Sequence, residues 1–401
     1  MTTPQASTDQ QPTLMSRDMV LLCLAQAAGY GASAFLAPLL PLYLVSRGHT
    51  ESYVGLVLAA FNVASFPSRP VWGVLSDRGW LRGSLTASGL LVGTAYLGYL
   101  VPNAAFIFLV RMVQGVGWGG VNVVGSAWAA LLAPATRRAE ALGWYTMAQR
   151  TGTALGPISA LWVLDHFGFE PAFLVGACVA YMIAVAAFLT RPAAAINLGP
   201  AQSRGSGLRS FIEPGALLGA ALITLMSSTG PAMNAYMPLY FRNLGLSHIE
   251  LYYIAYGVTG IACRPIIGTF ADRIGRMQAI SLGFGLQLVG MSLLALSADF
   301  PGIVAGMMVH TVGYAISEPS LYALGIDGSP ANRRGAAMAT ITMAFQLGGG
   351  IGFILSGFLF EFVGYREAYT VLLLPVSLAL IVSLWVWRRR RRAAAVTSDS
   401  A

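Results

Sequence analysis

Charged side chains inside long apolar stretches are the residues of this chain that could carry chemistry. Arg111, Arg150, His310 and Glu318 each lie within an apolar segment long enough to cross a bilayer as a helix. A charge there is costly unless it is paired or hydrated, so each one predicts a functional role. A carboxyl or an imidazole can exchange a proton, and an arginine can hold an anion or influence a nearby proton site.

Arg111 and Arg150 also have purely structural interpretations. Arg111 can be a buried guanidinium bonded to backbone carbonyls and to Ser33 or Gln26. Arg150 can extend its long side chain toward the lipid headgroups. Both alternatives stay open from the sequence.

Glu318 is the one carboxylate that we place inside a span, and it can be a proton carrier, a cation contact or a capped polar residue beside Pro319. An internal repeat, described below, sets Glu318 level with Asn122, eleven residues deeper than Arg111. Eleven residues of helix span about 16 Å, which argues against a direct Arg111–Glu318 pair. His310, level with Gln114, can titrate near neutral pH or be a packed helix-face histidine.

Composition identifies the elements that must position these residues. Hydrophobic residues make up 56% of the 401 positions and charged residues 10%, which is typical of a membrane-spanning protein. The polar first 18 residues do not have the form of a signal peptide. Twelve spans are predicted, at 19–46, 52–75, 83–101, 104–130, 140–165, 170–190, 214–241, 250–271, 277–297, 301–325, 335–361 and 366–387.

The arginines set the predicted orientation. All 24 basic residues are arginine, and an orientation with the N-terminus inside puts 17 of them on the cytoplasmic side, leaving Arg47, Arg242 and Arg366 outside. This asymmetry places both chain ends in the cytoplasm of a multi-pass protein of the cell membrane. It also explains the net charge of +8 without a nucleic-acid partner. The run at 388–392 either stops the last span or contacts lipid headgroups or a regulator.

The chain repeats itself at an offset of 195–197 residues. "RPVWGVLSDR" at 69–78 returns as "RPIIGTFADR" at 264–273, and "APATRRAEA" at 133–141 aligns with "SPANRRGAA" at 329–337. The repeat predicts two six-helix bundles of the same orientation, over 19–190 and 214–387, flanked by tails 1–18 and 388–401 and joined by a linker at 191–213. Parallel repeats of this kind are typical of transporters.

On these repeats and motifs the chain resembles the major facilitator superfamily over nearly its whole length. The family's Gly-x-x-x-Asp-Arg-x-Gly-Arg loop is matched fully by the second copy and, up to Trp80 and Leu81, by the first. The resemblance implies that each loop aspartate meets the N-terminus of a helix in the other half, as a conformational latch. The latch residues would be Gly73, Asp77, Arg78, Gly268, Asp272, Arg273, Gly275 and Arg276, with Arg137, Arg138, Arg333 and Arg334 as further partners.

Two further stretches resemble the proton-coupled exporting members of that family. "RMVQGVGWG" matches their fourth-helix pattern at Arg111, Gln114, Gly115 and Gly117. The fifth helix carries Gly143, Gly152, Gly156 and Pro157 at the exporters' spacing, with Ala160 and Leu161 replacing the last glycines. Its small residues and Gly-Pro step can form a gate, or they can serve close packing alone.

The resemblance implies a central cavity between the first, fourth, seventh and tenth helices. The exporters' acid of the first helix is absent from "AQAAGYGASAFLAP", so Glu318 is the leading substitute. The predicted cavity residues, aromatic and polar with few charges, suit an amphipathic or aromatic solute. They are Gln26, Tyr30, Arg111, Gln114, Trp118, Asn122, Asn234, Tyr236, His310, Tyr314 and Glu318.

The sequence therefore predicts an all-α membrane protein, monomeric, that exports small organic molecules by proton antiport and alternating access. The alternative is a transporter or facilitator of a sugar, an organic acid or a metallophore-like metabolite, working in either direction. We expect no enzyme activity, cofactor or metal, because the sequence offers no nucleophile–base set, ligand cluster or nucleotide loop. Cys23, Cys178 and Cys263 have no paired spacing, so disulfides and zinc are not expected.

Overall fold

The computed structural model describes residues 15–133, 137–191, 212–263, 274–330 and 333–399, without the side chains of 138–139 and 393–399. The first half contains α1 (Arg17–Ser46), α2 (Glu51–Asp77), α3 (Leu81–Gly98), α4 (Ala104–Leu132), α5 (Arg138–Phe167) and α6 (Phe169–Leu189). The second half contains η3 (Pro214–Ala216), α7 (Leu217–Ser227), α8 (Gly230–Asn234), α9 (Met237–Asn243), α10 (Ile249–Ala262), α12 (Arg276–Leu296), α13 (Phe300–Asp327), α14 (Arg334–Phe362), α15 (Tyr365–Val371) and α16 (Leu373–Asp399).

Short polar side chains begin several of these helices. Ser16, Thr50 and Asn103 each accept a hydrogen bond from a backbone N–H in the first turn of α1, α2 and α4. Asp299 does the same for α13. Such caps pair N–H groups that have no partner inside the helix.

Nine segments of the described chain are long and apolar enough to cross a membrane. They correspond to the first, second, fourth, sixth, seventh, ninth, tenth, eleventh and twelfth predicted spans. The shorter α3, the more charged α5 and α10 occupy the three remaining positions, and 264–273, the inner part of the eighth span, lies outside the described residues. The order and type of the predicted helices are confirmed.

The two halves pack their helices in equivalent pairs. In the first half α1 lies along α5, and α3 lies against both α4 and α6; in the second, α7 lies along α14, and α12 against both α13 and α16. Glycines allow the closest approaches. A Cβ at Gly156 would come 2.6 Å from the Gly31 carbonyl of α1, so only glycine fits there without a shift.

The seventh and twelfth predicted spans differ from single helices. The seventh is divided into α7, α8 and α9, with Pro231 and Pro238 in the first turns of α8 and α9, because proline has no N–H to continue the helical ladder. The twelfth is divided at Leu372 into α15 and α16. The tail predicted from 388 is helical to Asp399, so the arginine run lies within α16.

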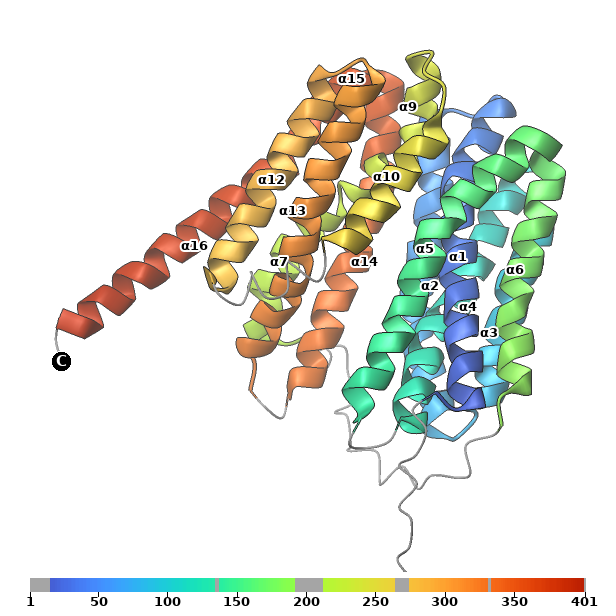
Figure 1. The fold of residues 1–401 in the computed structure, drawn as a ribbon, viewed down its shortest axis with the longest axis horizontal. Coiled ribbons are helices and arrows are strands. Elements are labelled where there is room, and N and C mark those ends of the chain that lie inside the picture. The colour runs from blue at the N-terminus through green and yellow to red at the C-terminus, as the bar shows by residue number, and fades with distance from the viewer. Residues whose placement is uncertain (1–14, 134–136, 192–211, 264–273, 331–332, 400–401) are drawn as a thin grey trace, which may run out of the picture.

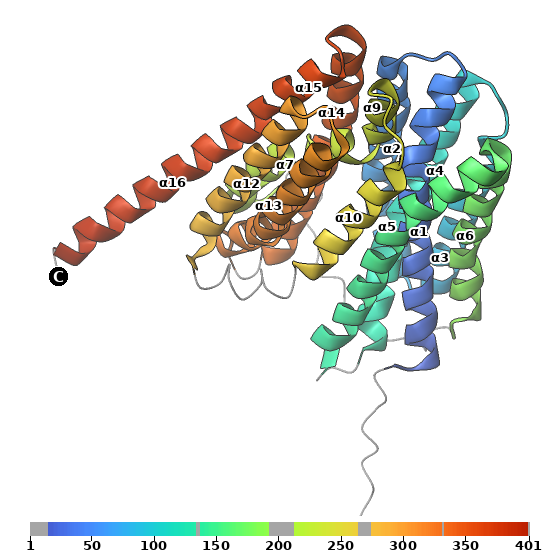
Figure 2. The same cartoon turned by 45° about the horizontal axis from the view of Figure 1, so that its top comes forward.

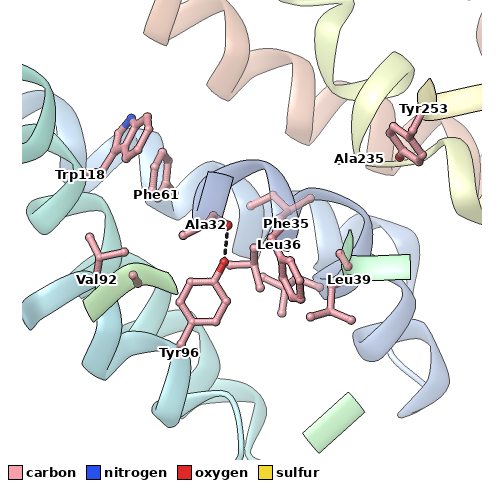
Figure 3. Close-up of a cluster of buried hydrophobic side chains, with 14 of the residues drawn as sticks. Ala32, Phe35, Leu36, Leu39, Phe61, Val92, Tyr96, Trp118, Ala235 and Tyr253 are labelled. Carbon is pink, nitrogen blue, oxygen red and sulfur yellow. Dashed lines mark hydrogen bonds between the residues drawn. The ribbon is translucent and has the colours of Figure 1, made fainter. Parts of the chain in front are cut away.

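Large apolar side chains fill the first half. Figure 3 shows Tyr96 of α3 pointing at α1, where its hydroxyl donates to the Ala32 carbonyl; Phe61 and Trp118 belong to the same apolar cluster. Tyr96 and Ala32 are fully buried. A paired hydroxyl in this position avoids the cost of burying an unsatisfied polar group.

The helices of the two halves meet at one end of the bundle and diverge toward the other (Figures 1 and 2). We call the end where the halves meet the Glu51 end, because α2 starts there at Glu51. We call the opposite end the Arg17 end, because α1 starts there at Arg17. At the Glu51 end α2 packs on α14: a Cβ at Gly55 would lie 2.5 Å from the Phe353 carbonyl. Helices α5 and α10 also contact one another across the halves.

Candidate functional site

An ion pair joins the two halves in the middle of the bundle. The Arg150 guanidinium of α5 lies 3.5 Å from the Glu318 carboxylate of α13, and the two side chains are 35% and 15% exposed. Arg150 is twelve residues beyond the first residue of α5, about 18 Å along a helix. Because an acceptor of the other half holds the guanidinium, the interpretation of Arg150 as a side chain that only reaches for the membrane surface does not account for its contact.

Aromatic and polar residues of the first half surround this pair. The Tyr30 hydroxyl of α1 donates to Oδ1 of Asn122 on α4 at 2.7 Å, and the Tyr30 ring centroid lies 4.7 Å from that of Trp118. Arg150, Glu318 and Arg69 all lie close enough to Tyr30 for their charges to act on its hydroxyl. The level predicted for Glu318 agrees with this placement, because Asn122 and Glu318 both lie near Tyr30.

Arg69 of α2 adds a second cation. It interacts electrostatically with Tyr30 and with Tyr322 of α13, and its Nε is buried with no hydrogen-bond partner among the described residues. We call Tyr30, Arg69, Arg150, Glu318 and Tyr322 the central cluster. With two arginines and one glutamate the cluster carries a net charge of +1 when all three are ionised.

A small cleft of about 70 Å³ opens beside Arg150. Residues of α5, α10 and α13 line it, among them Tyr256, Thr311 and Tyr314. The cleft thus contains the predicted Tyr314, but of the first, fourth, seventh and tenth helices that the family resemblance implied only the tenth, α13, lines it. It lies where the halves touch, so a relative movement of the halves would change its size.

Arg111 and Gln114 lie in a separate buried network of the first half. The Arg111 guanidinium donates to Oε1 of Gln114 at 2.6 Å and lies 4.5 Å from the Phe61 ring centroid. The Tyr99 hydroxyl donates to the same Gln114 oxygen at 2.7 Å. The structural alternative for Arg111 therefore has the wrong partners: Gln114 and Phe61 hold it, whereas Gln26 accepts from the Tyr145 hydroxyl.

His310, Asn234 and Tyr236 also lie apart from the central cluster. His310 is buried where α13 packs on Gly290 of α12, and its Nε2 has no hydrogen-bond partner among the described residues. Asn234 donates to the Gly230 carbonyl within α8. Tyr236 is fully buried at the Glu51 end, where its hydroxyl contacts the Glu51 and Phe353 carbonyls at 3.3 and 3.2 Å.

Hydrogen bonds between the halves close the Glu51 end. The Tyr365 hydroxyl of α15 donates to Oε1 of Glu51 at 2.9 Å. The Ser52 backbone N–H, in the first turn of α2, donates to Oε2 of Glu361 at 3.0 Å, so a carboxylate of the second half meets a helix N-terminus of the first. Together with Tyr236 these residues form what we call the Glu51 latch.

The latch predicted from the repeated loop is not assembled in the described residues of the Arg17 end. Asp77 is exposed, with no hydrogen bond or ion pair there, and a Cβ at Gly73 would meet nothing within 4 Å. No described helix therefore approaches Gly73 closely in this conformation. Gly268, Asp272 and Arg273 lie outside the described residues, as does the side chain of Arg138.

Three of the described arginines of this predicted latch pair within their own halves. Arg276 pairs with Asp327, and Arg333 pairs with Glu213 and donates to the Ile212 carbonyl at 3.3 Å. Arg137 pairs with Glu140 at 2.9 Å just before α5, and Gly275 precedes α12 with a φ of 88°. Arg78, which caps the end of α2, and Arg334, which begins α14, are exposed.

The fifth-helix glycines divide into two groups. A Cβ at Gly152 or Gly156 would meet the backbone of α1 at Ala27 or Gly31, so these two positions serve close packing. A Cβ at Gly143 would meet nothing within 4 Å, so the close-packing alternative does not apply to Gly143, and the gate stays a prediction. Helix α5 continues through Pro157 without a break.

Sequence reasoning missed Tyr322, an aromatic residue of the tenth predicted span with no distinguishing signal. It also missed Arg69, Glu51, Glu361 and Tyr365. Arg69 is the first residue of the repeated "RPVWGVLSDR". It could have been identified from the sequence, because it is an arginine inside an apolar span. The other three lie at predicted span ends, where polar residues are ordinary. Only the contact between the halves distinguishes them.

Comparisons with known proteins agree with the fold and its repeat. The family model described as Major Facilitator Superfamily matches residues 22–352 and 255–401. An uncharacterized transporter of this type from Methanocaldococcus jannaschii is 25% identical over 84% of this chain and 89% of its own. The multi-drug resistance efflux pump PmrA homolog of Lactococcus lactis is 25% identical over 88% and 89%.

Solved structures extend the agreement to the arrangement of the helices. The crystal structure of a D-xylose-proton symporter superposes with a TM-score of 0.77 at 18% identity, covering 92% of this chain and 97% of that one. An all-α chain with this paired architecture, matched by the family model over most of its length, belongs to the Major Facilitator Superfamily.

Proposed function

We propose that the chain exports small amphipathic or drug-like organic molecules from the cell by alternating access, driven by proton antiport. As a member of its superfamily the protein is a multi-pass membrane transporter and not an enzyme. The Arg150–Glu318 pair between the halves is the observation that carries the proposal. The name of the Lactococcus relative, an efflux pump, supports the direction.

In this proposal the protein lies in the plasma membrane, and its Arg17 end faces the cytoplasm. The arginine asymmetry of the loops supports that orientation. The Glu51 latch then closes the outer side, and the structure corresponds to the state that accepts solute from inside.

The central cluster suggests how a proton can be exchanged for solute. Glu318 in the carboxylate form attracts Arg150 across the seam. Protonation of the carboxyl removes that attraction, and with it the negative charge that a cationic solute would contact. A solute that binds only when Glu318 is deprotonated and a proton that neutralises Glu318 would therefore bind in alternation, as antiport requires.

A second candidate is the transport of an organic acid, in either direction. The excess of two arginines over one glutamate in the central cluster favours it, because an arginine pairs well with a carboxylate. The D-xylose carrier with the same fold is a proton symporter. The second candidate therefore includes inward transport.

The test is transport by proteoliposomes under an imposed pH gradient. Aromatic cations, organic acids and sugars are offered in turn, and proton movement is followed with a pH-sensitive dye. Antiport predicts that an added cation drives proton movement, that Glu318→Gln abolishes it, and that Glu318→Asp keeps part of it. Asp77→Asn should slow solute and proton movement together.

The matched control is Glu250→Gln, because the Glu250 side chain is 40% exposed and pairs only with His248 among the described residues. Solute flux that ignores both the gradient and Glu318→Gln would contradict the proposal and indicate a facilitator. Proton movement with organic acids alone would establish the second candidate.

A further inference from the structure

A groove of about 460 Å³ lies between α12 and α16, apart from the central cluster. Leu282, Gly285, Leu286 and Val289 of α12 and Leu384 and Trp387 of α16 line it. Leu282 and Val289 are 41% and 52% exposed, so the groove opens on the outer surface of the bundle. An apolar groove on that surface is open to lipid.

Arginine side chains lie at one end of the groove. Trp387 and Arg388 lie three and four residues after Leu384, and Arg391 lies four residues after Trp387 and three after Arg388, so the four side chains share one face of α16. The Arg391 guanidinium lies 5.8 Å from the centroid of the Trp387 ring, which itself lines the groove. Both arginines are exposed.

The arginine run stays helical and extends away from the body of the bundle (Figures 1 and 2). Gln278, near the start of α12, adds a polar side chain to the lining of the groove. The groove therefore offers apolar walls beside an exposed row of guanidinium groups. Neither feature belongs to the transport site.

We propose that this groove binds an anionic phospholipid, with one acyl chain along the apolar walls and the phosphate-bearing headgroup at Arg388 and Arg391. The charge of the run selects an anionic headgroup, and guanidinium groups pair readily with phosphate. Tryptophan beside the arginines is typical of the level at which headgroups lie. A second copy of the chain would bring its own arginine run against this one.

The test is native mass spectrometry of the full chain purified in detergent. The chain is mixed with phosphatidylglycerol and phosphatidylcholine that have identical acyl chains, and the retained adducts are counted. The wild type should retain phosphatidylglycerol in preference to phosphatidylcholine. In Arg388→Gln/Arg391→Gln the preference should fall by about fivefold for each arginine removed.

Gly285→Leu tests the walls of the groove without a packing clash, because a Cβ at Gly285 would meet nothing within 4 Å. The leucine should displace the acyl chain and reduce the retention of both lipids. Two matched controls should behave as the wild type. Gly83→Leu adds the same side chain at an equally open glycine of α3, and Arg17→Gln/Arg191→Gln removes two exposed arginines elsewhere.

Equal retention of the two lipids by the wild type would overturn the proposal. So would a loss of preference of the same size in Arg17→Gln/Arg191→Gln, which would mean that overall charge attracts the lipid. Retention unchanged in Gly285→Leu would show that the groove holds no chain. A doubled mass in the wild type that Gly285→Leu abolishes would assign the groove to a second copy instead.

Discussion

Removal of one hydroxyl from the Glu51 latch should shift the resting conformation of the transporter. Tyr365→Phe deletes the donor that reaches Glu51 across the halves at 2.9 Å and leaves the ring to pack on Phe360, whose centroid lies 4.9 Å away. A hydrogen bond to a charged acceptor contributes about 1.5–3 kcal/mol. Both side chains are partly exposed, so we take the low end of that range. A cost of about 1.4 kcal/mol corresponds to a tenfold shift in the equilibrium toward the state that opens at the Glu51 end.

Tyr369→Phe is the matched control for this shift. Tyr369 is one helical turn further along α15, and its hydroxyl donates to the Ala232 carbonyl at 2.8 Å. That bond lies within the second half, so both conformations can keep it. The control therefore loses the same atom and a bond of similar length without a change in the relative stability of the two conformations.

The assay measures how fast a thiol at the α2–α14 seam reacts. Asn62 lies there, 3.5 Å from where a Cβ at Gly350 would be. In a background without the native cysteines, Asn62→Cys is exposed to a membrane-impermeant maleimide added on the Glu51 side. Tyr365→Phe should raise the labelling rate about tenfold, and Tyr369→Phe should not. An unchanged rate in Tyr365→Phe, or an equal rise in both variants, would refute the argument that this bond holds the end closed.

Two further predictions concern packing and charge in the bundle. Gly152→Ala should destabilise the protein by about 1–3 kcal/mol and so lower its thermal unfolding midpoint, because the new Cβ would meet the Ala27 carbonyl of α1. Gly143→Ala should leave the midpoint unchanged or raise it, because its Cβ would meet nothing within 4 Å. Equal midpoints for the two variants would contradict this reading of α5. Arg150→Gln and Glu318→Gln should each destabilise the protein, and the double variant should lose less than their sum, with an interaction energy of about 1 kcal/mol in a thermal-unfolding cycle. Strictly additive losses would mean that the two charges do not interact.

The sequence predicts the fold well because its signals are local and repeated. Apolar length defines the spans, and a constant offset of 195–197 residues reveals the two halves. Features that depend on proline are harder to locate. Pro231 and Pro238 divide the seventh span, while Pro157 and Pro319 leave α5 and α13 continuous. Neighbouring helices decide whether the freed backbone groups find partners.

The candidate site is less predictable because periodicity gives the depth of a residue but not its partner. The repeat sets Glu318 level with Asn122, and both lie near Tyr30 in the structure. Nothing in the spacing indicates that Arg150 approaches Glu318 from the other half. That contact depends on how the halves are inclined, which is a property of the assembled bundle. The same reason explains why the Glu51 latch was missed.

Helices α2 and α14 connect the two ends of the bundle. At the Glu51 end they touch: a Cβ at Gly357 of α14 would lie 2.5 Å from the Glu51 carbonyl of α2. At the other end Asp77 of α2 is exposed, and Arg333, just before α14, pairs with Glu213 of its own half. If both helices move as rigid rods, Asp77 can approach the start of α14 only as Glu51 and Gly357 separate. We therefore expect the two latches to exclude one another, so that Asp77→Asn slows labelling of Asn62→Cys from the Glu51 side, where Tyr365→Phe accelerates it. If Asp77→Asn instead accelerated that labelling, the two ends would open independently and the rigid-rod argument would fail.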